Sequence, residues 1–184
     1  MKRTLFPGYS VGTDAYEDIK EICPAYGKKA AIIGGKHALA AAQDKIIAAA
    51  KEAGIEIIGP FWYGGEASVE NIEMLKPKVA DADMIFAVGG GKAIDTCKVL
   101  SHSTDRPFFT FPTIASTCAS CTSLGILYHP DGSLREYSFS KIPPKHIFID
   151  TQIIADAPDK YLWAGIGDTM AKHYEGTGYS RGDI

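Results

Sequence analysis

Two hydrophobic periods alternate along the chain, and this alternation limits the folds that the sequence can adopt. Short apolar runs predict buried strands at residues 29–34, 55–61, 84–88 and 108–111. Apolar residues at helical spacing predict helices between them, over residues 39–53, 68–79 and 91 to about 102. Strands joined in this way form parallel units with right-handed crossovers. The predicted fold class is therefore α/β, with a doubly wound, mostly parallel sheet.

The pattern changes after Pro112. Residues 123–128 and 134–138 flank the turn residues PDG, which predicts a β-hairpin inserted into the α/β fold. A further strand is predicted at 146–150, and helical spacing returns after Pro158.

Composition and charge exclude several classes of protein. The net charge is −3, and neither sign forms long runs, which argues against a nucleic-acid or anionic-membrane partner. No apolar stretch approaches the roughly 20 residues that span a bilayer. The N-terminal residues lack the apolar core of a signal peptide, and four cysteines do not indicate a disulfide scaffold. A cytoplasmic protein is expected.

Residues 89–91 are three glycines that follow a predicted buried strand and open a helix. Glycine lets the backbone approach a ligand closely, and the first N–H groups of a helix are unpaired donors at its positive end. This combination favours a phosphate or pyrophosphate. The run has neither the GxGxxG fingerprint nor the P-loop spacing, so a simple strand-to-helix turn is an equally good interpretation of the glycines alone. Residues 112–117 (PTIAST) follow the next strand and offer hydroxyls to a cofactor, although an ordinary Ser/Thr turn has the same composition.

Taken together, the stretches GGGKAIDTCK, PTIASTCASCTSLGILY and AGIGDTMAKHYE resemble the glycerol dehydrogenase branch of the iron-containing alcohol dehydrogenases. The resemblance implies a dehydroquinate synthase-like dinucleotide-binding domain at residues 1–157. Residues 158–184 would begin an all-α domain whose remainder is expected to be missing. The implied activity is NAD(P)-dependent and metal-dependent oxidation of the CH–OH group of a small alcohol, with the corresponding carbonyl compound as the other substrate.

The resemblance also implies which residues form the site. It places the following residues at the NAD or NADP cofactor: Gly35, Gly90, Gly91, Lys92, Ala93, Ile94, Asp95, Thr113, Ser116, Thr122, Leu124 and Tyr128. Asp168 matches the aspartate ligand of a zinc or iron ion that acts as a Lewis acid, and two histidines of the helical domain would complete the site. None of the five histidines here lies in an HxxxH pair, and no catalytic residue is identified in this chain. We therefore expect the 184-residue chain to bind no stoichiometric metal at Asp168 and to show no alcohol oxidation. We also expect it to self-associate as a homo-oligomer or to dock a missing domain.

Two positions depart from the family pattern. Cys118 occupies the place of an aspartate that contacts the polyol, and a thiol is a poor hydrogen-bond acceptor, so a less hydroxylated substrate than glycerol is predicted. Lys36 lies near the strand end where a carboxylate usually binds the adenosine ribose, and a lysine there would attract the 2′-phosphate of NADP. Cys118 and Cys121 also form a CxxC, a candidate redox pair or half of a zinc site, with coincidence as the favoured interpretation.

Three alternatives remain open at this point. A sugar-phosphate cyclase of the dehydroquinate synthase type shares the fold and a GGG motif, and a glycerol-1-phosphate dehydrogenase also uses GGGxxxD. The hydroxyl-rich loop fits the polyol dehydrogenases better than either. The third alternative is a non-catalytic, truncated NAD(P)-binding protein.

Overall fold

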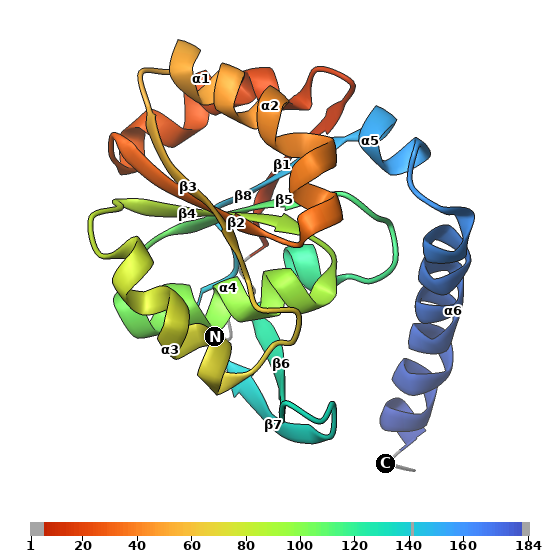
Figure 1. The fold of residues 1–184 in the computed structure, drawn as a ribbon. Coiled ribbons are helices and arrows are strands. Elements are labelled where there is room, and N and C mark those ends of the chain that lie inside the picture. Colours follow the sequence, from red (N-terminus) through yellow and green to blue (C-terminus); the bar gives the residue numbers. More distant parts are fainter. Residues whose placement is uncertain (1–5, 141, 182–184) are drawn as a thin grey trace, which may run out of the picture.

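A computed structural model describes residues 6–140 and 142–181. Its centre is a six-stranded parallel sheet with the order β1-β8-β5-β4-β2-β3 (Figure 1). The strands of this sheet are β1 (Gly8–Gly12), β2 (Lys29–Gly34), β3 (Glu56–Trp62), β4 (Met84–Gly89), β5 (Phe108–Pro112) and β8 (His146–Asp150). A separate antiparallel pair consists of β6 (Leu124–Tyr128) and β7 (Leu134–Phe139). The predicted α/β class, parallel sheet and β-hairpin are confirmed.

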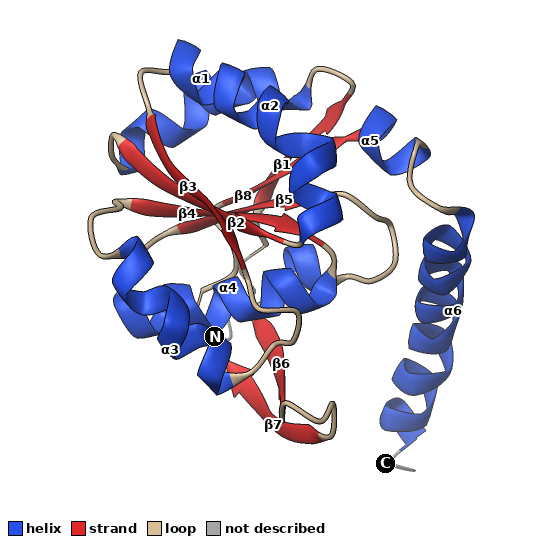
Figure 2. Ribbon diagram, viewed as in Figure 1, coloured by secondary structure: helices blue, strands red, loops and turns tan. Residues whose placement is uncertain are grey.

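Helices cover both faces of the sheet (Figure 2). The helices are α1 (Ile19–Ile22), α2 (Lys36–Glu52), α3 (Val69–Leu75), α4 (Gly91–Thr104), α5 (Thr151–Ala155) and α6 (Asp159–Arg181). One apolar cluster joins α1 and α2 to the sheet through side chains such as Ile32 and Phe86. The opposite cluster joins α3 and α4 through Ile33 and Ile85. Adjacent residues of one strand enter opposite clusters because side chains alternate across a strand.

Several elements differ from the sequence prediction. Helices α1 and α5 were not predicted, and the helix predicted at 68–79 is α-helical only as far as Leu75. No strand was predicted before residue 29, yet β1 pairs with β8 at the edge of the sheet. Tyr9 and Val11 are exposed on that edge strand, so it lacks the buried apolar run by which the others were found. Helix α4 continues past His102 to Thr104, where Asp105 ends it in a left-handed conformation with φ 51°.

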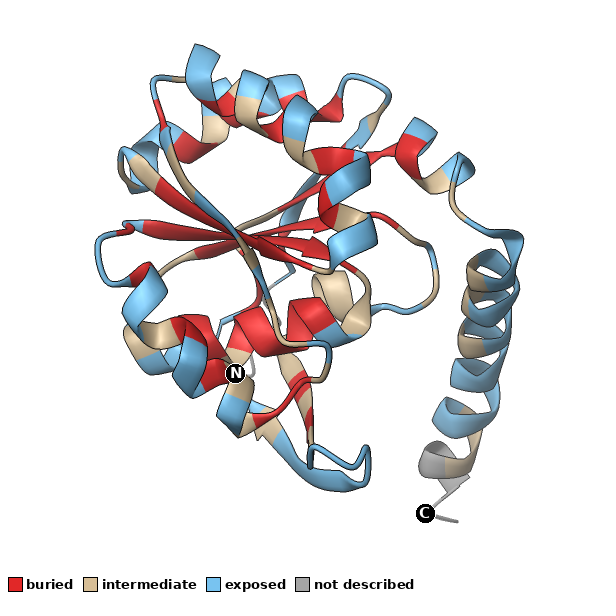
Figure 3. Ribbon diagram, in the orientation of Figure 1, coloured by how far each residue is buried: buried red, intermediate tan, exposed pale blue. Residues whose placement is uncertain are grey.

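Helix α6 stands apart from the buried layers. Figure 3 shows it almost entirely exposed, whereas the central strands are buried. Four of its large apolar side chains are mostly exposed, namely Leu162, Trp163, Met170 and Tyr174. In the described residues, no helix is long and apolar enough to cross a membrane.

Candidate functional site

The glycine turn lies where the chain reverses its direction of winding. From β2 the chain proceeds to β3 on one side, and then crosses back to β4 on the other side of β2. The helices that follow β2 and β4 therefore lie on opposite faces of the sheet. Open parallel sheets bind ligands at such a switch point, outside the carboxyl ends of the strands.

Gly89 closes the gap between the two helices. Its φ of 139° lies in the region that favours glycine. A Cβ atom at this position would lie 3.3 Å from Cβ of Ala93 and 3.4 Å from Cβ of Ala38. Gly34, at the end of the neighbouring strand, has as little room, since its Cβ would lie 2.5 Å from the backbone oxygen of Val88. These positions bring the first turns of α2 and α4 together.

Each of these two helices has a glycine at its N-cap position and therefore no side-chain cap. Gly35 precedes α2 and Gly90 precedes α4, and neither can supply a capping oxygen. The first intrahelical bond of α4 runs from the Ile94 N–H to the Gly90 oxygen at 3.1 Å. Helix geometry therefore leaves the N–H groups of residues 91–93 without an intrahelical partner. Two positive helix ends at one switch point suit the pyrophosphate of a dinucleotide, which the residues present can hold.

The hydroxyl-rich loop lies against this turn. The Thr113 N–H donates to the Gly89 oxygen at 3.3 Å, and Thr113 is buried. A Cβ atom on Gly90 would lie 2.6 Å from Cδ1 of Ile114, and one on Gly91 would lie 3.3 Å from Cγ2 of Thr117. Ser116 is half-buried in the same loop. The two motifs that were separate in the sequence thus form one surface.

An ion pair between Lys92 and Glu66 borders the glycine turn. The sequence did not predict this contact. Lys92 Nζ lies 2.6 Å from Glu66 Oε2, and the lysine lies over the Tyr128 ring at 5.9 Å from its centre. The hydrogen bond to Glu66 raises the pKa of Lys92. The Tyr63 ring approaches Gly35, because a Cβ atom there would lie 3.6 Å from Tyr63 Cε1. The loop after β3 therefore forms a further wall of the site. Its position at the carboxyl end of a parallel strand is the sequence feature that could have predicted this role.

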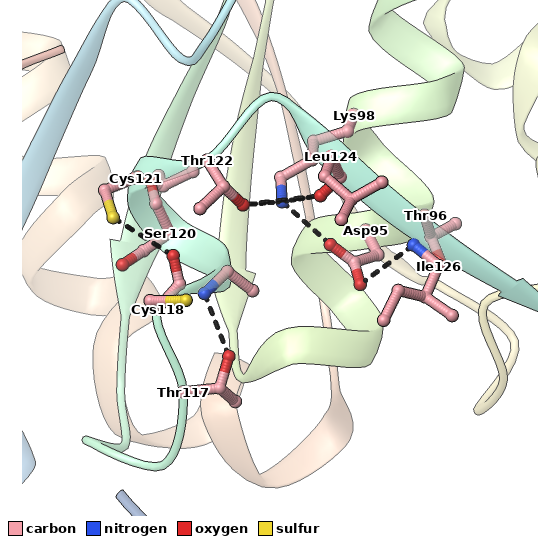
Figure 4. A network of polar contacts seen from close by, with 12 residues as sticks. Asp95, Thr96, Lys98, Thr117, Cys118, Ser120, Cys121, Thr122, Leu124 and Ile126 are labelled. Atoms are coloured by element: carbon pink, nitrogen blue, oxygen red, sulfur yellow. Dashed lines mark hydrogen bonds and ion pairs between the residues drawn. The ribbon is translucent and has the colours of Figure 1, made fainter. Parts of the chain in front are cut away.

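Asp95, Thr122 and Leu124 lie in one buried network around Lys98 (Figure 4). Lys98 Nζ lies 2.9 Å from Asp95 Oδ1, 3.0 Å from Thr122 Oγ1 and 2.7 Å from the Leu124 oxygen. The second carboxylate oxygen of Asp95 accepts from the Ile126 N–H at 3.3 Å. Burial raises the pKa of Asp95, which Lys98 and the Ile126 N–H partly offset. The network links β6 to α4. In the structure, these three predicted residues therefore stabilise the packing of the hairpin strand against the helix that begins at the glycine turn.

The remaining predicted residues occupy distinct positions. Ala93 and Ile94 are buried in α4, while Cys118 is exposed on the loop. Lys36 begins α2 and lies over the Trp62 ring at 4.9 Å from its centre. A cavity of about 630 Å³ lies at the amino ends of the strands, beside the start of β5.

Asp168 lies on α6, and its closest cation is Lys172 at 3.4 Å. Within residues 6–140 and 142–181, no group of three or more His, Cys, Asp or Glu side chains is placed to hold a metal ion. The described residues do not fit a catalytic metal, which needs about three protein ligands. The Asp168 assignment remains a prediction.

Gly165 fixes α6 against the hydroxyl-rich loop. A Cβ atom at this position would overlap the backbone oxygen of Ala115, whereas one at Gly167 would meet nothing within 4 Å. We expect Gly165→Ala to release α6 and to increase tryptic cleavage after Lys172, because an isolated helix of this length is marginal in water. Gly167→Ala is the matched control and should stabilise the helix by about 0.5–1 kcal/mol. Equal cleavage of the two variants would contradict this contact.

Comparisons with known proteins agree with this fold. Residues 7–151 match the family model of the iron-containing alcohol dehydrogenases. A glycerol dehydrogenase of Escherichia coli is 36% identical over 95% of this chain and 48% of its own length. Hydroxycarboxylate dehydrogenase A of the same species is 37% identical over 80% of this chain and 40% of its own length. The crystal structure of a Schizosaccharomyces pombe glycerol dehydrogenase matches with a TM-score of 0.82 and 31% identity, covering 93% of this chain and 44% of that one.

These matches set the scope of the assignment. The chain spans about half the length of the curated relatives that it matches. The family model, by contrast, covers well over half of the chain itself. The chain belongs to the iron-containing alcohol dehydrogenase family.

Proposed function

We propose that this chain is the dinucleotide-binding part of an NAD(P)-dependent alcohol oxidoreductase. The observation that carries the proposal is the pair of uncapped helix ends at the switch point, beside the glycine turn of residues 89–91. The N–H groups at the start of α4 bind the pyrophosphate, and the loop of residues 113–117 lies where the nicotinamide ribose would be held. The cofactor, when bound, accepts or donates hydride. The protein's part is to bind it and to orient its reactive ring.

The substrate in this proposal is a small alcohol or the matching carbonyl compound. Cys118 is exposed on the loop that also carries Thr117, which packs against the glycine turn. A thiol accepts hydrogen bonds weakly, so this position favours a substrate with fewer hydroxyls than glycerol. Asp168 would contribute one ligand to a zinc or iron ion, and we propose no step that passes through that ion.

Titration of NADH into the 184-residue polypeptide tests the proposal. Enhanced NADH fluorescence should saturate, and ADP should compete because it carries the same pyrophosphate. Adenosine, which lacks the pyrophosphate, should compete poorly at equal concentration. A linear, unsaturable signal, or equal competition by adenosine and ADP, would contradict a pyrophosphate site at the glycine turn.

Lys36 bears on the choice between NADH and NADPH. Lys36 lies at the first turn of α2, at the carboxyl end of β2. Opposite charges in this exposed setting contribute at most about 1 kcal/mol, so we expect the two dissociation constants to lie within about ten-fold of each other. Lys36→Asp should shift the preference towards NADH.

The control for this prediction is Lys51→Asp, which makes the same charge change about 22 Å farther along the same helix. It should leave the preference unchanged, because that separation is nearly three times the Debye length of about 8 Å at physiological salt. A preference for NADH well above ten-fold in the unmodified chain would show that other contacts set the choice.

A further inference from the structure

Cys118 directly precedes a short 3-10 helix, and Cys121 is the last residue of that helix. Cys118 precedes the turn Ala119–Cys121, and the Cys121 N–H donates to the Cys118 oxygen at 3.1 Å. Side chains three residues apart eclipse on such a turn, and its rise separates their Cα atoms by about 6 Å. Disulfides span Cα separations of roughly 4.4–6.8 Å. The Cys121 thiol already points back along the turn, since its Sγ donates to the Cys118 oxygen at 3.1 Å.

The pair differs from the other two cysteines in its access to solvent. Cys118 is exposed and Cys121 is half-buried, whereas Cys23 and Cys97 are fully buried. Burial raises the pKa of the Cys23 thiol to about 12 and raises that of Cys97 as well. Since the thiolate is the reactive form, the two buried cysteines are poor targets for an oxidant.

We propose that Cys118 and Cys121 form an oxidisable dithiol that closes to an intramolecular disulfide in the presence of a hydroperoxide. The Cys118 thiolate attacks the O–O bond of hydrogen peroxide, which leaves a sulfenic acid and, after proton uptake, water. The Cys121 thiol then attacks the sulfenic sulfur and expels a second water. Two thiols and one peroxide thus become one disulfide and two waters, and an added dithiol reductant reverses the change.

The disulfide would act on the cofactor site through direct packing. A Cβ atom on Gly91 would lie 3.3 Å from Cγ2 of Thr117 and 3.8 Å from Cβ of Ala119. The Ala119 N–H donates to Thr117 Oγ1 at 2.9 Å, so movement of the turn is transmitted to the residue that packs on the first turn of α4. This consequence rests on the proposed function. We expect the NADH dissociation constant to differ between the dithiol and disulfide forms.

The test is thiol titration and intact-mass measurement of the folded polypeptide before and after hydrogen peroxide treatment. We expect both thiols of the pair to become unreactive, the mass to fall by two hydrogen atoms, and peptide mapping to place the bond between Cys118 and Cys121. At micromolar protein, ring closure should be at least ~100-fold faster than formation of intermolecular disulfides, because linked thiols have an effective concentration in the millimolar range. A bond elsewhere, or thiols oxidised to sulfinic acids without a disulfide, would overturn the proposal.

Two variants make the test independent of the cofactor. Cys118→Ser should abolish the loss of two hydrogen atoms. Moving the second thiol by one residue, with Cys121→Ser and Ser120→Cys together, keeps the cysteine content but places the thiols out of eclipse, and should slow closure. Equal closure in the moved variant would contradict the geometric argument. If NADH does not bind, the proposed function fails, while the mass measurement still decides whether the disulfide forms. If NADH binds the dithiol and disulfide forms equally, the proposed effect of the disulfide on cofactor binding is wrong.

Discussion

Lys98→Met is expected to lower the free energy of unfolding by about 3–5 kcal/mol, because it leaves the buried Asp95 carboxylate without its counter-charge. The Lys98 side chain is fully buried, and its ammonium group contacts Asp95, Thr122 and the Leu124 oxygen. All three contacts are lost in the variant. Denaturant unfolding of the variant and the unmodified chain measures the difference.

The matched control is the double variant Asp95→Leu with Lys98→Met. It should recover a large part of the loss, since replacing a whole buried ion pair by apolar side chains is often nearly neutral. A single Lys98→Met variant within about 1 kcal/mol of the unmodified chain would show that the pair is not a buried contact.

The loss should also depend on pH. Burial raises the pKa of Asp95, and Lys98 acts against that rise, so removing Lys98 raises the folded-state pKa further. A carboxyl whose folded pKa is raised is best tolerated below its unfolded pKa, about 3.9. The deficit of the variant should therefore be smallest at acid pH, grow as pH rises from about 3.9 to the raised folded-state pKa, and level off above it.

Gly90→Val is expected to weaken NADH binding at least about 100-fold, which corresponds to about 2.7 kcal/mol or one to two lost hydrogen bonds to a charged group. A Cβ atom on Gly90 would lie 2.6 Å from Cδ1 of Ile114, so the valine would displace the Ile114 side chain and occupy space at the first turn of α4 that the pyrophosphate would otherwise approach. Titration of NADH fluorescence gives the two dissociation constants.

Gly167→Val serves as the control for that titration, because a side chain there meets nothing within 4 Å. It should bind NADH as the unmodified chain does. Retained binding by a folded Gly90→Val variant would contradict a pyrophosphate at this turn.

Much of the fold was predictable because buried strands and amphipathic helices leave strong periodic signals. Residues 84–88, a fully apolar run followed by glycines, predicted both the strand and the turn that begins α4. β1 gave no such signal, since Tyr9 and Val11 are exposed at the edge of the sheet. An edge strand is specified by its pairing partner, which for β1 is β8, well over 100 residues away in sequence.

The candidate site was predictable as a set of motifs but not as an arrangement. The glycine turn and the hydroxyl-rich loop are local patterns, and the order of the strands brings them together. Glu66 was missed because its partner Lys92 lies 26 residues away. Lys98 was missed because, apart from Asp95, its partners are distant in sequence, and Thr122 lies 24 residues away. A charged residue in a predicted helix is expected to face solvent when its neighbours in space are unknown. Lys98 is instead fully buried.

Determination of the structure of this chain with NADH bound tests the central claim most directly. We expect the pyrophosphate to lie at the N–H groups of residues 91–93, between the first turns of α2 and α4, with the nicotinamide towards residues 113–117. A dinucleotide bound instead in the cavity of about 630 Å³ at the amino ends of the strands, beside Phe108 and Lys145, would contradict it.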